Sequence, residues 1–377
     1  DAEMARTLAT LDTVHVSERD RVARDADKQP DISGTEQTVT NEAVSPNEQG
    51  DLNAIAGSIP GITSILGADG DPTGFSVLGL SADQNSVTLN GSPFGGANLP
   101  RDANVSYSLV TAPYDVSRGG FSGGQLNIRT GAGSNFIRRN MSLNLDAPQL
   151  QWTDPSARAL GQQYTNVSLG GSLAGPIVFD KAFYNFSYQL GRRSSDLRTL
   201  LNTNPIGLQA SGISADSVQR LVGILNAEGI PTIIDGRIPQ SSMRDNGSLF
   251  GSINLSPPSS RSAQTFNLTF SGNWNRQRPS DHSSSEVPAR DGDRTRLNGS
   301  VQLTHTAYLH TKILTESTVG IDASRSYGSP YLTLPAASVL VNSDFADGTS
   351  GVQTIGFGGN PGLNTRSGSF NISGNNE

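Results

Sequence analysis

Beyond residue 135, hydrophobic and polar residues alternate along several long segments of the chain. In the clearest segment, residues 265–274, one face carries Phe266, Leu268, Phe270, Gly272 and Trp274, and the other carries Thr265, Asn267, Thr269, Ser271 and Asn273. A period of two residues is typical of a β-strand with one apolar and one polar face. The pattern recurs at residues 141–147, 167–173, 184–190, 249–255 and 297–303, less regularly at 313–323, and partly around Phe370 and Ile372. The sequence therefore predicts about eight strands.

The alternation fits two architectures, because it does not say which face of a strand meets water. A soluble β-sandwich buries the apolar face, whereas an outer-membrane barrel turns that face to lipid. The polar faces here are rich in Ser, Asn, Thr and Gln, as a hydrated lumen allows. The connections also alternate between short ones (174–181, 257–262, 307–310) and long ones (191–247, 279–293, 327–366). Both features favour the barrel, and the sandwich remains the alternative.

Aromatic residues lie near the ends of the predicted strands. They are Trp152, Tyr164, Tyr184, Trp274, Tyr308 and Tyr327. Such positions fit the aromatic girdles of membrane barrels, and they fit equally the ordinary preference of aromatic residues for strands.

The N-terminal part of the chain has a different organisation. Residues 51–60 start with Asp51, a good N-cap, and place Leu52, Ile55 and Ile59 at helical spacing before Pro60 ends the helix. Short strands are expected at 75–80, 86–89 and 124–130, separated by glycine-rich turns. This predicts a small α+β unit that ends near residue 131. Residues 18–50 are polar and charged with almost no large apolar residue, so they are predicted to form a flexible linker.

One further helix is expected inside the long connection 191–247. Residues 214–228 begin with the plausible N-cap Ser214, carry Val218, Leu221, Val222 and Leu225 on one face, and are followed by Gly229 as a stop signal.

The composition excludes several classes of protein. The net charge of −7 and pI near 5.2 argue against a nucleic-acid binder. There is no run of 18 apolar residues, so no membrane-spanning helix is expected. The absence of cysteine removes disulfides, thiolate metal sites and cysteine nucleophiles.

No catalytic constellation is visible. The four histidines, His15, His282, His305 and His310, are scattered and form no metal-binding motif. Asp-Gly-Asp stretches at 69–71 and 291–293 lack the spacing of a calcium loop and are read as turns. The sequence predicts no enzyme activity, no cofactor and no metal site.

Four stretches resemble the TonB-dependent outer-membrane receptors. Residues 51–65, with Ile-Pro-Gly at 59–61, are similar to the opening helix of the family's plug domain, and residues 75–91 are similar to a later plug stretch. Residues 118–135 resemble the segment that closes the plug, and residues 175–184 (Gly-Pro-Ile-Val-Phe-Asp-Lys-Ala-Phe-Tyr) resemble the turn between the second and third barrel strands. Leu78 and Asn90 replace the family's usual arginine and aspartate. Within the family, the likeness is greatest to the Oar-like subgroup.

The resemblance implies an all-β fold: a small α+β plug inside a transmembrane antiparallel β-barrel of 22 strands. On this basis residues 1–17 are a possible TonB-box segment, 18–50 a flexible linker, 51–133 the plug, and 134–377 the N-terminal, incomplete part of the barrel. About eight of the implied strands fall within this chain, so we expect it to be a piece of a longer protein.

The resemblance also implies partners and sites. Asp12, Thr13, Val14, His15, Val16 and Ser17 are similar to the TonB box, through which the periplasmic protein TonB and its inner-membrane energising complex would act by strand addition. The alternative is that this segment is the last strand of a preceding domain. Candidate ligand contacts lie at a plug loop tip, at Ser92, Pro93, Phe94 and Asn98, and in the long connection 191–247. Packing of Phe94 against the barrel wall is the alternative for that residue.

The predicted function is therefore energy-coupled transport of an extracellular ligand across the outer membrane of a Gram-negative bacterium. The plug and N-terminus would lie on the periplasmic side, the long loops would be extracellular, and lipid would surround the barrel. The alternative is a non-transporting protein for surface binding, assembly or adhesion, and a soluble β-sandwich enzyme is a more distant third. No residue cluster identifies the ligand.

Overall fold

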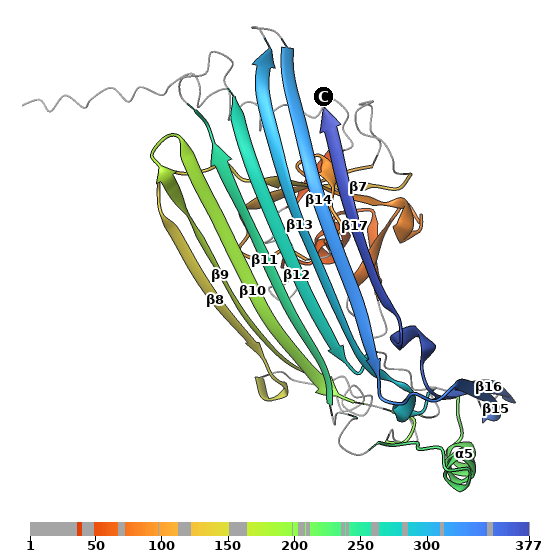
Figure 1. Cartoon of the computed structure of the whole chain (residues 1–377). Helices are drawn as coiled ribbons and strands as arrows, with labels where there is room; N and C mark the ends of the chain where they lie inside the picture. Colours follow the sequence, from red (N-terminus) through yellow and green to blue (C-terminus); the bar gives the residue numbers. More distant parts are fainter. Residues whose placement is uncertain are drawn as a thin grey trace, which may run out of the picture.

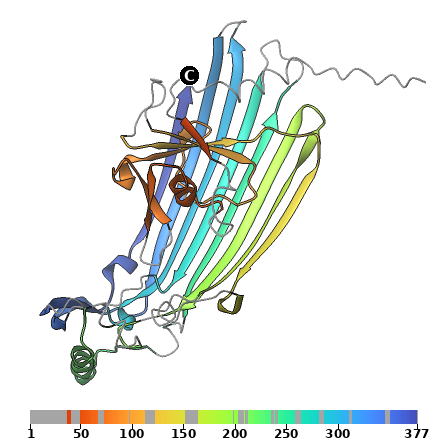
Figure 2. The ribbon, with the colours of Figure 1, turned by 180° about the vertical axis from the view of Figure 1, so that it is seen from behind.

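A computed structural model describes most of the chain beyond residue 48. The described residues are 36–39, 49–66, 72–96, 98–111, 122–150, 164–197, 199–202, 208, 212–234, 238, 241–257, 264–280, 286–309, 313–344 and 350–376. They form one long antiparallel sheet and a smaller unit around the five-stranded sheet of residues 36–130, which we call the plug and which lies on the concave face of the long sheet (Figures 1 and 2).

The long sheet has eight strands in the order β17-β14-β13-β12-β11-β10-β9-β8. Their bounds are β8 Arg138–Asp146, β9 Tyr164–Val178, β10 Ala182–Asp196, β11 Ser241–Leu255, β12 Thr265–Arg278, β13 Gly292–Leu309, β14 Ile313–Pro330 and β17 Arg366–Asn376. Each alternating segment of the sequence corresponds to one of these eight strands, and the count of 22 strands for a whole barrel stays a prediction. The sheet is not closed, because β8 and β17 do not pair with each other.

Short connections between the strands lie at one end of the sheet, and long connections lie at the other end. The turn from β9 to β10 is only Phe179–Lys181, and Asp180 adopts φ +61° within it. This is the turn predicted at 174–181. The connections from β10 to β11, β12 to β13 and β14 to β17 are longer, and they lie at the opposite end, which is the lower end in Figure 1. We call these the short-turn end and the long-connection end.

Two details at the long-connection end differ from the prediction. The connection expected at 191–247 is shorter, because β10 runs on to Asp196 and β11 starts at Ser241. The connection expected at 327–366 contains a hairpin, β15 (Ala336–Asp344) and β16 (Ser350–Gly358), which the sequence did not predict.

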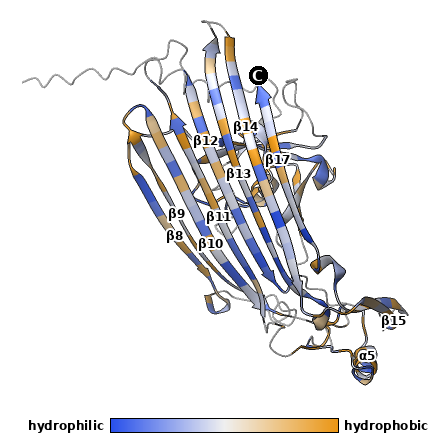
Figure 3. Cartoon of the chain, in the orientation of Figure 1, coloured by the Kyte–Doolittle hydropathy of each residue, from blue (hydrophilic) through white to orange (hydrophobic). Residues whose placement is uncertain are grey.

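The long sheet is apolar outside and polar inside. Leu143, Val319 and Phe370 point outward and are 68%, 54% and 67% exposed, whereas Ser252 and Thr269 point toward the plug and are each 1% exposed. Hydrophobic and hydrophilic bands alternate along every strand in Figure 3. A soluble sandwich would bury its apolar face, so this sheet is not one. A continuous exposed apolar face is instead typical of a surface that contacts lipid.

The plug has its own sheet, in the order β1-β6-β7-β4-β5. The bounds are β1 Glu36–Val39, β4 Ser86–Leu89, β5 Ser92–Pro93, β6 Val105–Val110 and β7 Gln125–Thr130; the hairpin β2 (Ile62–Leu66) and β3 (Pro72–Val77) and the helix α2 (Leu52–Gly57) pack beside it. Tyr107, Leu109, Leu126 and Ile128 form the centre of an apolar core and are almost fully buried. The predicted strands near 75–80, 86–89 and 124–130 correspond to β3, β4 and β7, while β1, β2, β5 and β6 were not predicted.

Helix α2 begins where the sequence predicts. The Asp51 carboxylate Oδ1 accepts hydrogen bonds from the backbone N–H groups of Asn53 and Ala54 at 2.9 and 3.2 Å. These are donors that an uncapped helix leaves unsatisfied. Leu52 and Ile55 turn into the plug core and are 2% and 0% exposed.

The predicted linker 18–50 contains a strand. Glu36–Val39 pairs antiparallel with β6, from Glu36 opposite Val110 to Val39 opposite Tyr107. These four residues therefore extend the plug sheet, which differs from the flexible linker predicted from composition. The backbone groups of β6 supply a partner that composition cannot reveal.

The long connections fold into a second, smaller unit with its own apolar core, which we call the cap. It contains helix α5 (Ala215–Ala227), the hairpin β15–β16 and the short 3-10 helix Pro288–Arg290. Ser214 caps α5 as predicted, because its Oγ accepts from the Ser217 N–H at 3.2 Å, and Gly229 follows the helix at φ +70°. Among the described residues, neither helix is long and apolar enough to cross a membrane.

Candidate functional site

The inner face of the long sheet is organised in rows of side chains that run across the strands. Partners in adjacent strands lie about 4.8 Å apart, so residues in register form a continuous row. The row nearest the long-connection end contains Asp146, Asn166, Arg193, Arg244, Gln277 and Arg294. The next row toward the plug contains Asn144, Ser168, Gly191, Asn246, Asn275, Arg296 and Ser326. Every side chain in both rows is polar.

Four arginines in these two rows form a basic surface on the inner face. We call Arg193, Arg244, Arg294 and Arg296 the lumen arginines. Asp146 is the only acidic residue in the two rows, and its Oδ2 accepts from the Asn166 amide at 3.4 Å. Neither Arg294 nor Arg296 forms an ion pair with another described residue. The surface therefore carries an excess of positive charge.

Local contacts orient two of the lumen arginines. The Arg193 guanidinium lies 4.3 Å from the centre of the Tyr164 ring, at cation–π distance. With the Gln277 amide turned to accept, its oxygen lies 3.0 Å from Nε and 2.9 Å from Nη2 of Arg244. Pre-oriented guanidinium groups bind carboxylate or phosphate oxygens in pairs with little loss of side-chain entropy. This surface can therefore bind an anion.

A cavity of about 260 Å³ lies between the plug and the inner face, on the plug side of these rows. From the plug it is lined by Gly95 and Gly96, and from the sheet by Ser271, Asn273, Asn298, Gly299, Ser300, Asp322, Ala323, Ser324 and Ser369. Asn298 is two residues along β13 from Arg296, on the same face. The polar surface is thus continuous from the lumen arginines to the plug loop.

The candidate residues at the plug loop tip occupy different environments. Phe94 is 6% exposed and belongs to the plug core, so its ring is not on the cavity surface. Ser92 is buried, Pro93 is exposed, and Asn98 is half-buried in a β-bridge with Asp51. The loop does reach the cavity, through its two glycines.

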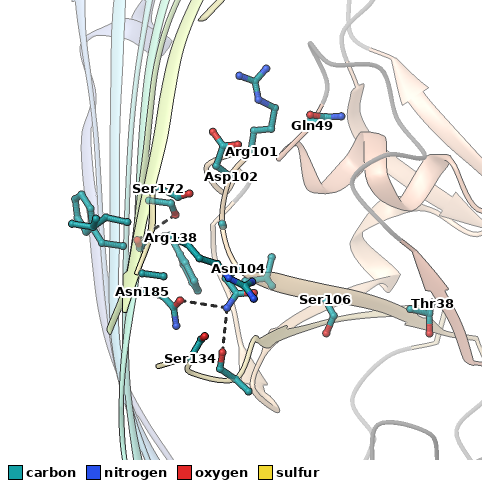
Figure 4. A pocket seen from close by; sticks show the side chains of 18 residues that line it. Thr38, Gln49, Arg101, Asp102, Asn104, Ser106, Ser134, Arg138, Ser172 and Asn185 are labelled. Carbon is teal, nitrogen blue, oxygen red and sulfur yellow. Dashed lines mark hydrogen bonds between the residues drawn. The ribbon is translucent and has the colours of Figure 1, made fainter. Parts of the chain in front are cut away.

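The plug meets the wall formed by β8–β10 through polar groups. The Asp102 carboxylate accepts from the Asn140 amide at 2.7 Å and from the Ser142 hydroxyl at 2.9 Å. The backbone N–H of Arg101 donates to Gln189 Oε1 at 2.8 Å. A cavity of about 510 Å³ lies beside these contacts. Figure 4 shows it between the plug loop 101–106 and the strands that carry Arg138, Ser172 and Asn185.

The plug meets the wall formed by β11–β13 more closely. The Phe250 side chain enters the plug core from β11 and is 1% exposed. Neutral hydrogen bonds accompany it: Asn90 Nδ2 to Thr269 Oγ1 at 3.3 Å, Asn267 Nδ2 to Thr130 Oγ1 at 3.0 Å, and Gln302 Nε2 to the Leu89 carbonyl at 3.0 Å. The plug is therefore packed against one wall and hydrogen-bonded across a cavity to the other.

The sequence and the structure were compared with those of known proteins. No protein-family model matches the sequence, and no curated protein matches it significantly. The structure is similar to a variant of the ferric enterobactin receptor PfeA of Pseudomonas aeruginosa in complex with enterobactin, with a TM-score of 0.56 and 13% identity over 90% of this chain and 45% of that chain. It is similar to the outer membrane transporter YddB of Escherichia coli, with a TM-score of 0.52 and 13% identity over 89% and 43%. The fold is that of the TonB-dependent outer-membrane receptors.

The chain spans less than half the length of these receptors. At this identity the likeness shows the receptor fold alone, and the neighbours are receptors and transporters rather than enzymes. None of the comparisons tests the Oar-like subgroup, which stays a prediction.

Two plug positions depart from the receptor family's usual residues, and both have positive φ. Asn90 adopts φ +48°, a conformation that asparagine tolerates well. Its Oδ1 accepts from the Thr130 N–H at 3.0 Å, so it links β4 to β7 as well as to the sheet wall. Leu78 adopts φ +53° and is 80% exposed.

The predicted TonB-box residues 12–17 lie outside the described residues. Among the described residues, no group of three or more histidine, aspartate or glutamate side chains could hold a metal ion. The lumen arginines were not predicted from the sequence. Their signal was the parity of the strands: Arg244 and Arg294 continue the polar faces of β11 and β13 beyond the point where the apolar face ends.

Proposed function

We propose that this protein is a TonB-dependent outer-membrane transporter, which binds an extracellular ligand in the lumen and moves it past the plug by energy-coupled rearrangement. The observation that carries the proposal is the plug seated against a polar concave face whose outer side is apolar. The long-connection end would be extracellular and the short-turn end periplasmic. The Oar-like subgroup remains part of the proposal on the strength of the sequence stretches alone.

The ligand we propose is an anion. The lumen arginines lie between the long connections and the plug cavity, on the route that such a ligand would take. Their positive charge would attract an acidic ligand and their guanidinium groups would bind its oxygens in pairs. One structural neighbour is a ferric enterobactin receptor in complex with enterobactin, so ferric siderophores are the first class to test.

The proposed partner is TonB, acting on residues 12–17. β1 supports this coupling, because it is the edge strand of the plug sheet and the described element nearest to that segment. It is held to β6 by only four residue pairs. A pull on the N-terminal segment would strip β1 from β6 and then act on the plug itself.

The test is a deletion of residues 12–17, compared with a deletion of residues 19–24, which removes the same length from the linker. Uptake of a radiolabelled ferric siderophore panel by cells should be lost in the first variant and retained in the second. Surface binding of the same compounds should be unchanged in both. Uptake that survives the deletion of 12–17 would contradict the energy coupling.

The alternative, a non-transporting protein for surface binding or adhesion, has one observation in its favour. The cap exposes apolar side chains, among them Ile224 at 60%, Leu340 at 69% and Val352 at 58%. Such residues on a folded surface unit suit contact with another macromolecule. Loss of cell-surface attachment on deleting the β15–β16 hairpin, with no uptake of any compound by the intact protein, would favour this alternative.

A further inference from the structure

The outer face of the long sheet carries a second group of arginines, separate from the lumen arginines. Arg192, Arg276, Arg278, Arg325 and Arg366 have the parity of the outward-facing apolar residues on their strands. The register of adjacent strands joins Arg192, Asp245, Arg276, Thr295, Tyr327 and Arg366 in one row across the sheet. We call these five arginines the outer rim.

The outer rim begins where the apolar face ends. On β12 the outward residues run from Phe266 to Trp274 and are followed by Arg276 and Arg278. That apolar stretch of about nine residues matches the length that a tilted strand needs to cross the hydrocarbon of a bilayer. On β14 and β17 the outward-facing residues follow the same order, apolar residues first and then an arginine. They run from Val319 to Arg325 on β14 and from Ile372 to Arg366 on β17.

Two aspartates hold part of the rim in place. Asp245 pairs with Arg192 and, at 3.8 Å, with Arg278, and Asp293 accepts from Arg276 Nη2 at 3.0 Å. The Tyr331 hydroxyl donates to Asp293 at 3.1 Å, and burial together with the Asp293 charge raises the pKa of Tyr331 far above its usual value, so the hydroxyl stays a donor.

The rim keeps an excess of positive charge. Arg325 and Arg366 are exposed and form no ion pair with another described residue, and Arg325 lies 5.9 Å from the centre of the Tyr327 ring. At the short-turn end, the described outward positions of β12–β14 that match the rim (Phe266, His305 and Ser317) carry no arginine. On β12–β14 the positive charge is therefore confined to one edge of the apolar face, whereas on β8 the exposed Arg139 has the outward parity at the short-turn end.

We propose that the outer rim binds the phosphate groups of acidic lipids in the outer leaflet of the membrane. The apolar face fixes the depth of the lipid chains, and the rim lies at the level where their headgroups begin. Arginine binds phosphate oxygens in pairs, and clustered arginines at this level attract anionic headgroups. The inference rests on the proposed outer-membrane location but not on transport.

The test measures lipid binding by the protein purified in zwitterionic detergent and transferred to phosphatidylcholine nanodiscs with or without lipid A, a phosphorylated glycolipid. Native mass spectrometry would count the lipid A molecules retained. The triple variant Arg276→Gln, Arg325→Gln and Arg366→Gln should bind lipid A on the order of a hundredfold more weakly, because each arginine near an anionic surface accounts for about a factor of five.

A matched control removes three arginines from the inner face instead, as Arg244→Gln, Arg294→Gln and Arg296→Gln. It should retain lipid A like the unaltered protein. Dephosphorylated lipid A should not be retained, and inorganic phosphate should not displace lipid A. Both triple variants are checked for folding by their heat-dependent gel mobility.

Equal retention of lipid A by the outer-rim variant and the unaltered protein would overturn the proposal, as would equal losses in the two triple variants. Displacement by inorganic phosphate would assign the rim to a soluble anion instead. Because no uptake is measured, failure of the transport proposal would leave this result intact, and failure here would leave transport intact.

Discussion

The plug and the long sheet use the same alternation of residues and bury opposite faces. In the plug, Leu126 and Ile128 of β7 turn inward and are fully buried. In the sheet, Leu143 of β8 turns outward and is 68% exposed, while Ser252 of β11 is buried. Periodicity therefore identifies strands in both regions but does not say which face is inside. The difference arises from the surroundings: the plug lies against the polar inner face of the sheet, and the apolar outer face of the sheet is suited to lipid.

Phe250 joins the two regions. It is the large apolar side chain on the inner face of the sheet that belongs to the plug core. Its neighbours along the same face of β11, Ser248 and Ser252, are polar. The sheet, whose inner face is polar beside Phe250, thus contributes one apolar residue to the plug core. Replacing this residue is the most direct test of how the two regions differ.

Replacing Phe250 with alanine should have the largest effect. Removing a buried phenylalanine costs about 3–5 kcal/mol, and here the cavity forms between the plug and the β11 wall. We expect the plug to become sensitive to limited proteolysis while the sheet keeps its heat-dependent gel mobility. The matched control is Phe270→Ala on the outward face of β12, where lipid chains can fill the space. Equal proteolysis of the two variants would contradict the anchoring role of Phe250.

A charge on the outer face should have the next largest effect. Leu303 lies on the outward face of β13 and is 45% exposed. Leu303→Arg should destabilise the sheet by about 2–4 kcal/mol, as cations do at the middle of a barrel's lipid face. Asn298→Arg, on the inner face of the same strand, should fold normally. Urea unfolding in phospholipid vesicles compares the two, and the reverse order would mean that the apolar face does not meet lipid.

The sequence predicted most of the fold, because the two signals it relied on are local. Alternation identified all eight strands of the sheet, and the N-caps Asp51 and Ser214 identified the two α-helices of the described residues. It missed β6 although Val105, Tyr107 and Leu109 alternate with Ser106 and Ser108, which is the same period of two residues that marks the strands of the long sheet. It missed β1 because a short polar strand becomes visible only through its partner.

The two groups of arginines lie where the strands no longer alternate between apolar and polar residues. Beyond the apolar face both sides of each strand are polar, so the period of two disappears although the strand continues. Arg192 and Arg193 of β10 illustrate this, because the first points outward and the second points into the lumen. The parity of each arginine, counted along its strand from the alternating segment, separates the outer rim from the lumen arginines.

The polar contacts between the plug and β8–β10 should contribute less to the stability of the plug than the packed contacts between the plug and β11–β13. We expect the double-mutant cycle of Asp102→Ala and Ser142→Ala to give a coupling energy of about 1–2 kcal/mol, the range for a partly exposed hydrogen bond to a carboxylate. Because the chain has no cysteine, Ser108→Cys in β6 provides a single buried reporter, and the rate of its labelling by maleimide measures opening of the plug.

The matched cycle pairs Asn90→Ala with Thr269→Ala on the opposite wall, where both partners are neutral. It should give a smaller coupling energy, since hydrogen bonds to charged groups are the stronger ones. A larger coupling for the neutral pair would mean that charge does not distinguish the two walls.

Removing the N-cap side chains of the two helices should have the smallest effects on stability. These two variants also distinguish the plug from the unit that we call the cap. Asp51→Ala and Ser214→Ala each remove a side chain that accepts from the first turn of a helix, which costs about 1 kcal/mol. The loss should stay within the unit that contains the helix. Hydrogen exchange should therefore speed up at 52–57 in the first variant and at 215–227 in the second. Faster exchange at 52–57 in Ser214→Ala would show instead that the cap and the plug open together.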